Sequence, residues 1–178
     1  MLRRLRTRGG AVSIDIHTLT IIAGLLNLAL FVVMMPAWAP VRDDHDRTLA
    51  LWTVGLALQA LYWVLLWQAR DTPTVYWLVP ANMAQMLSFA VFALAVHRFA
   101  RVDDRRIWVG VIVLLGLAGS LWFGVAEPSY PGRVAVVGSG LALLMALAAL
   151  PLLPSFLKPG RLAERITAVV FLGGAAVL

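Results

Sequence analysis

Long apolar stretches separated by short polar segments make up most of the chain. Five of these stretches cover residues 17–35, 48–67, 76–96, 107–125 and 134–153. Each approaches the roughly 20 residues that a helix needs to cross a hydrocarbon core of about 30 Å. A sixth stretch covers residues 166–178, and we expect it to continue in a longer protein. The pattern predicts an all-α, polytopic transmembrane helical bundle with five complete spans and a truncated sixth.

The composition agrees with a membrane protein. The 178 residues are 61% hydrophobic and 13% charged, with a mean hydropathy of +0.86, whereas about a quarter of the residues in soluble domains are charged. The absence of cysteine excludes disulfides, thiolate catalysis and cysteine-ligated metals. The net charge of +6 comes from arginines dispersed among short loops. This dispersal favours the lipid bilayer as partner and argues against nucleic acid.

The loop charges predict an orientation. Nine basic residues follow the first, third and fifth stretches: Arg42, Arg47, Arg98, Arg101, Arg105, Arg106, Lys158, Arg161 and Arg165. Only Arg70 and Arg133 follow the second and fourth. Since basic loops stay in the cytoplasm, we expect a multi-pass protein of a bacterial inner membrane with its N-terminus outside. Residues 1–13 form a basic N-terminal extension that opposes this orientation, and residues 14–178 form the membrane domain.

The extension and the first apolar stretch together imitate a secretory signal peptide, with "AWA" at residues 37–39 as the apparent cleavage site. We expect no cleavage there. The apolar core is longer than the usual 7 to 15 residues, and Pro40 would directly follow the site.

Polar residues at helical spacing follow one side of each of the first three predicted spans. They are Thr20 and Asn27, then Gln59 and Tyr62, then Asn82, Gln85 and Ser88, with Gly24 and Gly55 on the same sides. One interpretation is packing, in which each polar group bonds across helices and contributes about 1 kcal/mol. The other is an intramembrane polar site that senses a small ligand, a lipid or a quinone. Packing is the more ordinary outcome for such residues.

Small residues follow the fourth and fifth predicted spans. They are Gly116, Gly119, Ser120, Gly138, Ala142 and Ala146, at spacings that permit close approach of two helix backbones. The stripe is explained either by helix packing within one bundle or by the contact face of a dimer.

Few residues offer catalytic or ligand chemistry. The predicted spans contain no Asp, Glu, Lys or Arg, although ion-coupled carriers usually place such a residue at membrane depth. No catalytic or phosphate-binding motif is present. His17 and His97 lie near opposite bilayer faces, which argues against paired haem ligation. The run "DDHD" at residues 43–46 is either a cation site or a solvated loop, and solvation is the more common case. We therefore predict no catalytic residue, metal or cofactor.

The order of landmarks resembles the N-terminal multi-span region that precedes the GGDEF domain in many bacterial diguanylate cyclases. The segments are "DIHTLTIIAGLLNLALFVVM", "LWTVGLALQALYWVLLWQARDTP", "ANMAQML", "HRFAR" and "YPGRVAVVGSGLALL". The matching positions are Asp15, Thr18, Trp52, Gly55, Arg70, Pro73, Asn82, Arg98, Phe99 and Arg133. The resemblance covers residues 14–178, and residues 1–13 are additional to the family's usual start.

The resemblance implies a membrane sensory or anchoring region that controls cyclic di-GMP synthesis, in a parent protein that forms a homodimer. The GGDEF domain is absent from this sequence, so no catalytic residue can be carried over. With the N-terminus outside, a cytoplasmic cyclase requires an odd number of spans, and we expect a seventh after the sixth. The sequence names no stimulus. The alternatives are a small carrier for a neutral solute and a structural membrane scaffold.

Overall fold

The structure, a computed structural model, describes residues 16–38, 44–69, 75–102, 106–158 and 160–177. This part of the chain is helical throughout and contains no strand, which confirms the predicted all-α class. The elements in order are α1 (Ile16–Met34), η1 (Met35–Trp38), α2 (Asp44–Gln68), α3 (Val75–Phe99), α4 (Arg106–Leu121), η2 (Trp122–Ala126), α5 (Tyr130–Ala149), η3 (Leu150–Leu157) and α6 (Leu162–Val177). The extension at residues 1–13 lies outside the described residues.

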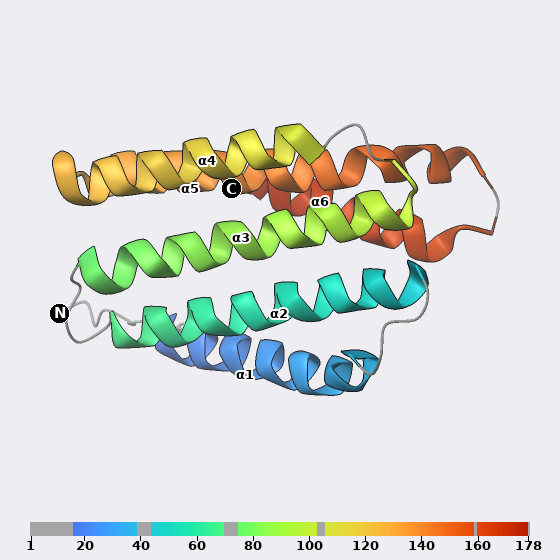
Figure 1. The fold of residues 1–178 in the computed structure, drawn as a ribbon, viewed down its shortest axis with the longest axis horizontal. Coiled ribbons are helices and arrows are strands. Elements are labelled where there is room, and N and C mark those ends of the chain that lie inside the picture. Colours follow the sequence, from blue (N-terminus) through green and yellow to red (C-terminus); the bar gives the residue numbers. More distant parts are fainter. Residues whose placement is uncertain (1–15, 39–43, 70–74, 103–105, 159, 178) are drawn as a thin grey trace, which may run out of the picture.

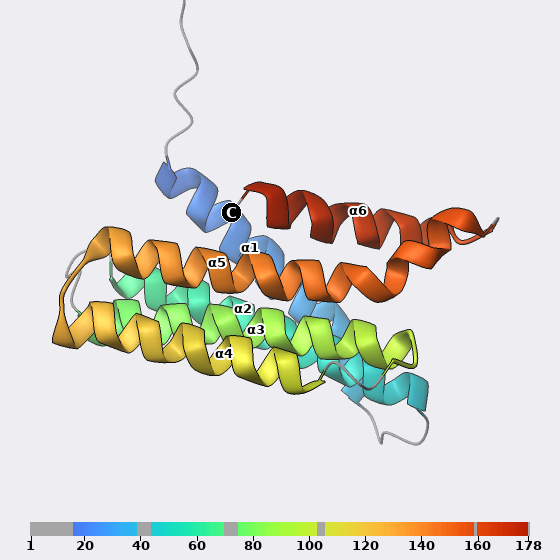
Figure 2. The same cartoon turned by 90° about the horizontal axis from the view of Figure 1, so that it is seen from above.

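The helices lie side by side and alternate in direction along the long axis of the molecule (Figure 1). Helix α3 is central, since it packs against α2, α4 and α5. Helix α1 packs on the outer side of α2, and α6 packs on α5 and η3 (Figure 2). The ends that join α1 to α2, α3 to α4 and α5 to α6 therefore meet at one end of the bundle (Figure 1), where most of the basic residues that the structure describes lie.

Four helical segments are long and apolar enough to cross a membrane: Arg47–Gln68, Val75–Phe99, Arg106–Ala126 and Tyr130–Leu157. The prediction of five complete spans is not confirmed. The first predicted span corresponds to α1, which has 19 residues, and only its part Ile21–Met34, which is shorter than a span, counts as an apolar helix among the described residues. Helix α1 ends just before Pro36, where a 3₁₀ turn replaces it, as expected for a residue that cannot continue the α-helical hydrogen bonds.

The outer faces of the helices are apolar. Leu114 and Leu115 on α4 are 68% and 67% exposed, and Val33 on α1 is 73% exposed. The interior holds Met86 and Leu144 among small residues such as Ala93 and Ala148. Large apolar side chains outside and small ones between helices are what a lipid environment favours, because lipid solvates the former and close helix approach requires the latter.

Helix α5 shows how the sequence sets helix ends. Its N-cap is Ser129, whose Oγ accepts a hydrogen bond from the backbone N–H of Gly132 at 3.2 Å, and Pro131 occupies the first turn. The helix therefore starts at Tyr130, earlier than the predicted residue 134. At the other end, the α-helix stops at Ala149 and continues as the 3₁₀ segment η3, which contains Pro151 and Pro154.

Helix α3 ends in a Schellman motif with an unusual residue. The N–H of Val102 bonds to the carbonyl of His97 at 2.9 Å, and the N–H of Arg101 bonds to the carbonyl of Arg98 at 3.0 Å. Arg101 occupies the left-handed position of this motif, with φ of 55°. Glycine is the usual residue there because it lacks a Cβ.

Candidate functional site

The polar stripes of α2 and α3 face each other. The Oγ of Ser88, fully buried on α3, donates a hydrogen bond to the backbone carbonyl of Gly55 on α2 at 2.8 Å. One turn along, the rings of Phe92 and Trp52 have their centroids 5.0 Å apart. These two contacts fix the antiparallel register of the helix pair.

The same register places the remaining polar residues of the two stripes at matching levels. One turn beyond Ser88, Gln85 lies at the level of Gln59, and Asn82 lies one further turn along, at the level of Tyr62. Gln59, Asn82 and Gln85 are half-buried. The Oε1 atom of Gln59 is buried without a hydrogen-bond partner. The two stripes thus form one band along the α2–α3 contact.

Within this band Ser88 makes the cross-helix bond that the packing interpretation predicts. Among the described residues, the amides of Asn82 and Gln85 have no hydrogen bond. The phenol ring of Tyr62 lies against its neighbour Trp63, with centroids 4.9 Å apart. Gln59 therefore offers a buried acceptor without a partner at the level of the Gln85 amide.

Asn27 of helix α1 does not join the band. The Nδ2 of Asn27 donates to the carbonyl of Ala23 in its own helix at 2.8 Å. A Cβ on Gly24 would lie 3.4 Å from the Cβ of Trp63, so this glycine supports the α1–α2 contact. The side chain of Thr20 lies outside the described residues. Asn27 thus departs from the expected bond across helices, because a carbonyl four residues back is within its reach.

A groove of about 340 Å³ lies between α1 and α2, and its walls are apolar. It is lined by Ile21, Gly24, Leu25, Leu28, Ala60, Trp63, Val64 and Trp67. Neither Asn27 nor Gln59 is among these residues. The groove is therefore open to acyl chains and offers few polar contacts for a polar ligand.

The small residues of α4 and α5 allow close helix packing around Met86 of α3. A Cβ on either Gly116 or Gly140 would collide with the end of the Met86 side chain, and one on Gly119 would collide with Val136. The glycine of α5 that faces this contact is Gly140, whereas Gly138, Ala142 and Ala146 are half-buried. Ser120 is 1% exposed, and its Oγ is buried without a partner.

His97 makes a contact that the sequence interpretation missed. The side chain is fully buried, and its Nε2 donates to the backbone carbonyl of Leu147 on α5 at 3.0 Å. In a continuous α-helix this carbonyl would accept from residue 151, but residue 151 is proline and has no N–H. The signal in the sequence was Pro151 itself, which frees a carbonyl inside an apolar segment.

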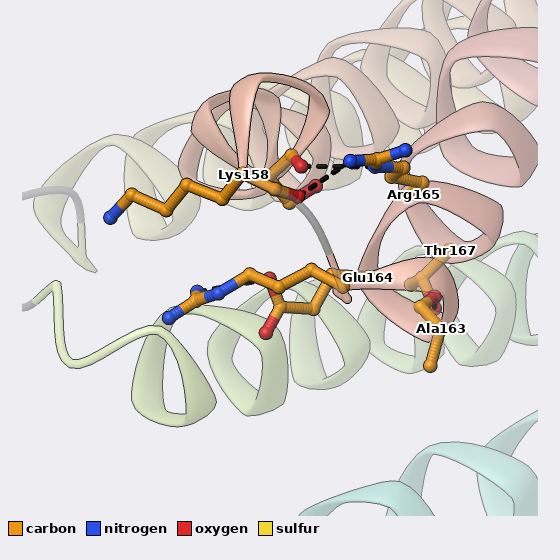
Figure 3. A network of polar contacts seen from close by, with 7 residues as sticks. Lys158, Ala163, Glu164, Arg165 and Thr167 are labelled. Atoms are coloured by element: carbon orange, nitrogen blue, oxygen red, sulfur yellow. Dashed lines mark hydrogen bonds and ion pairs between the residues drawn. The ribbon is translucent and has the colours of Figure 1, made fainter.

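A polar network joins η3 to the start of α6 (Figure 3). The Nε of Arg165 donates to the carbonyl of Ser155 at 3.0 Å, and a terminal nitrogen of the same guanidinium donates to the carbonyl of Lys158. Arg161, the residue before α6, forms an ion pair with Glu164 of α6 at 3.0 Å. Arg165 therefore supplies side-chain donors to two carbonyls at the end of η3, and the carbonyl of Ser155 also accepts from the backbone N–H of Lys158 at 3.2 Å.

The described residues contain no group of three or more His, Cys, Asp or Glu side chains that could hold a metal ion. The cation site considered at residues 43–46 is outside this test, because the side chains of that run are not described. Among the positions that carry the family resemblance, Asp15, Arg70 and Pro73 are also outside the described residues, whereas Trp52, Gly55 and Asn82 lie along the α2–α3 contact. No family model, curated protein or solved structure matches the chain.

Proposed function

We propose that the chain is the membrane-embedded anchoring or sensory region of a bacterial diguanylate cyclase. The observation that carries the proposal is the order of landmarks from "DIHTLT" to "YPGRVAVVGSG", which resembles the region preceding GGDEF domains. A helical bundle with four segments long and apolar enough to span a membrane is compatible with this role. The bacterial inner membrane and an external N-terminus belong to the same proposal, since they follow from the loop charges.

The proposed mechanism is a change in the packing of two protomers. The family's cyclase reaction joins two GTP-loaded domains, so its rate responds to dimer geometry. A stimulus acts on such a system only through different affinities for two bundle arrangements. The buried, unpartnered Oε1 of Gln59 marks the level of the α2–α3 band at which a ligand or a rearrangement would gain a hydrogen bond.

The outer groove between α4 and α5 is the proposed dimer contact. It has a volume of about 420 Å³ and is lined by Ile112, Leu115, Gly116, Gly119, Ala135, Val136, Ser139, Gly140 and Leu143. Two of its glycines, Gly116 and Gly140, face Met86 inside the bundle, so a helix of a second protomer would contact the small exposed residues Ala135 and Ser139. Ser139 and Leu143 are exposed beside it.

Reading the gene in frame beyond the codon for Leu178 tests the function. A GGDEF-coding segment is expected, and the encoded full-length protein should raise cellular cyclic di-GMP when expressed in a bacterium. The control is the same protein with its GGDEF motif inactivated. A coding segment for further transporter-like spans, or unchanged cyclic di-GMP with an intact GGDEF domain, contradicts the proposal.

The dimer contact has its own test, because the sequence has no native cysteine to interfere. Ser139→Cys in membranes should form an intermolecular disulfide under mild oxidation. Val33→Cys, on the exposed face of α1, should not. Equal crosslinking at both positions would indicate random collision and remove the α4–α5 groove from the proposal.

A further inference from the structure

Two cavities meet at the arginine-rich end of the bundle. A polar cavity of about 300 Å³ is lined by Phe99, Ala100, Arg101, Pro151, Leu152, Arg161 and Glu164. An apolar cavity of about 190 Å³ is lined by Trp52, Val96, Phe99, Leu152, Ala163, Glu164 and Thr167. Phe99, Leu152 and Glu164 line both. The two cavities therefore adjoin, with the polar one at the helix ends and the apolar one between α2, α3, η3 and α6.

Arg101 is held at the polar cavity by a strained backbone. Its φ of 55° is one that side-chain-bearing residues rarely adopt, and the two hydrogen bonds of the Schellman motif fix it there. Its side chain is exposed and, among the described residues, makes no hydrogen bond or ion pair. Strained backbone of this kind concentrates at functional sites, and here it presents a guanidinium with all its donors available.

Arg161 is the second cation of the polar cavity, and Glu164 orients it. Their ion pair at 3.0 Å uses one N–H of a guanidinium that has five. The side chain of Glu164 is 20% exposed, and that of Arg161 is 50% exposed, so the arginine remains accessible. Arg165 on the next turn does not line the cavity, since it binds the carbonyls of η3 (Figure 3).

The charges lining the polar cavity leave one net positive charge. Glu164 neutralises one of the two arginines, and the remaining charge matches one phosphodiester. A zwitterionic headgroup would also bring an ammonium group, for which Glu164, already paired, is a poor partner. The adjoining apolar walls of Val96, Phe99 and Leu152 suit the first carbons of an acyl chain.

We propose that this end of the bundle binds one anionic phospholipid, with its phosphodiester between Arg101 and Arg161 and an acyl chain entering the apolar cavity beside Trp52. The occupant is a lipid of the leaflet at this end, because the apolar cavity directly adjoins the phosphate site. Anionic leaflets attract basic residues by about fivefold in affinity per residue near the surface. The site does not rest on the proposed cyclase function.

Tryptophan quenching by brominated lipid tests the site in the full chain. The protein is reconstituted in phosphatidylcholine vesicles containing an equal, minor fraction of chain-brominated phosphatidylglycerol or chain-brominated phosphatidylcholine. The fluorescence of Trp52 is obtained by subtracting the fluorescence of the Trp52→Phe variant from that of the wild type. We expect stronger Trp52 quenching by the phosphatidylglycerol. The preference should fall about fivefold in Arg101→Gln or Arg161→Gln, by loss of one charge contact.

Matched variants separate a built site from general surface attraction. Lys158→Gln removes a positive charge from the same end, but this exposed residue lines neither cavity, so the preference should remain. Ala163→Phe fills the apolar cavity and should abolish the selective quenching with both arginines intact. This second variant keeps the test valid if an arginine substitution impairs folding.

Three results would overturn the proposal. Equal Trp52 quenching by the two brominated lipids would remove the headgroup preference. An equal loss of preference in Lys158→Gln would assign the effect to diffuse charge. Removal of the preference by inorganic phosphate in the millimolar range, at constant ionic strength, would indicate a site for free phosphate instead of lipid.

Discussion

The Oγ of Ser88 donates a hydrogen bond to the backbone carbonyl of Gly55, 2.8 Å away, and thereby joins α3 to α2. We predict that Ser88→Ala lowers the free energy of unfolding by about 1 kcal/mol, the usual contribution of an interhelical hydrogen bond in a membrane. Unfolding in mixed micelles with increasing SDS measures the change. Ser139→Ala, an exposed serine of α5, is the control and should leave stability unchanged. Equal effects of the two substitutions would show that the Ser88 bond contributes nothing specific.

Gly55 allows the ring of Phe92 to lie directly on the α2 backbone. A Cβ at this position would overlap the ring, so Gly55→Ala should destabilise the protein by about 1–3 kcal/mol through overpacking. Gly110→Ala is a matched control, because nothing lies within 4 Å of the added carbon. Phe92→Leu in the Gly55→Ala protein should recover part of the loss, and the same SDS titration reports all four proteins. No difference between the two alanine variants would contradict the close approach.

His97 compensates for the hydrogen bond that Pro151 cannot make. We predict that His97→Phe lowers stability by about 1–2 kcal/mol, because the buried carbonyl of Leu147 loses its donor. Pro151→Ala should be less harmful, or even beneficial, in the His97→Phe background, since the new alanine offers a backbone N–H to that carbonyl. A double-mutant cycle measures this coupling. Additive effects of the two substitutions would contradict the compensation.

We predict that substitutions of Arg101 affect the stability of the protein and its binding of anionic lipid in opposite directions. Arg101→Gly relieves the left-handed strain and should raise stability by about 1 kcal/mol, while Arg101→Gln should leave stability nearly unchanged. Both should weaken retention of anionic lipid. A glycine variant of unchanged or lower stability would show that the strain is absent or that the arginine makes a compensating contact.

The orientation is tested with single cysteines at exposed ends of helices. Glu127→Cys lies between α4 and α5, and Lys158→Cys lies between α5 and α6. From the loop charges we predict that an impermeant thiol reagent labels Glu127→Cys in intact spheroplasts and labels Lys158→Cys only after permeabilisation. The opposite result would reverse the topology.

The sequence predicted the helical class and most span positions, because lipid-facing apolar runs of this length leave few alternatives. It did not predict where α5 changes to 3₁₀ geometry or that a 3₁₀ turn follows α1. Those features depend on Pro151, Pro154 and Pro36, whose effects depend on what supplies the missing hydrogen bonds. Helix-end proline positions are visible in a sequence, but their tertiary partners are not.

The polar band was predictable only in part. Helical spacing correctly put Ser88 on a face toward another helix, but the register that sets it opposite Gly55 depends on the fit of Phe92 over that glycine. Likewise, the stripe along α5 suggested Gly138, whereas Gly140 faces Met86, because the side chain from α3 determines which small residue is needed. Pairing across helices is therefore the information that a single sequence lacks.

The hydrogen bond by which His97 replaces the missing N–H of Pro151 also has a consequence for membrane insertion. When α5 enters the bilayer, the carbonyl of Leu147 has no donor within its own helix, and an unpaired carbonyl in hydrocarbon costs several kcal/mol. Helix α3 precedes α5 in the chain, so His97 is synthesised and inserted first. We therefore expect the final turn of α5 to be completed only when it docks on α3, so that this corner assembles from the N-terminal to the C-terminal side.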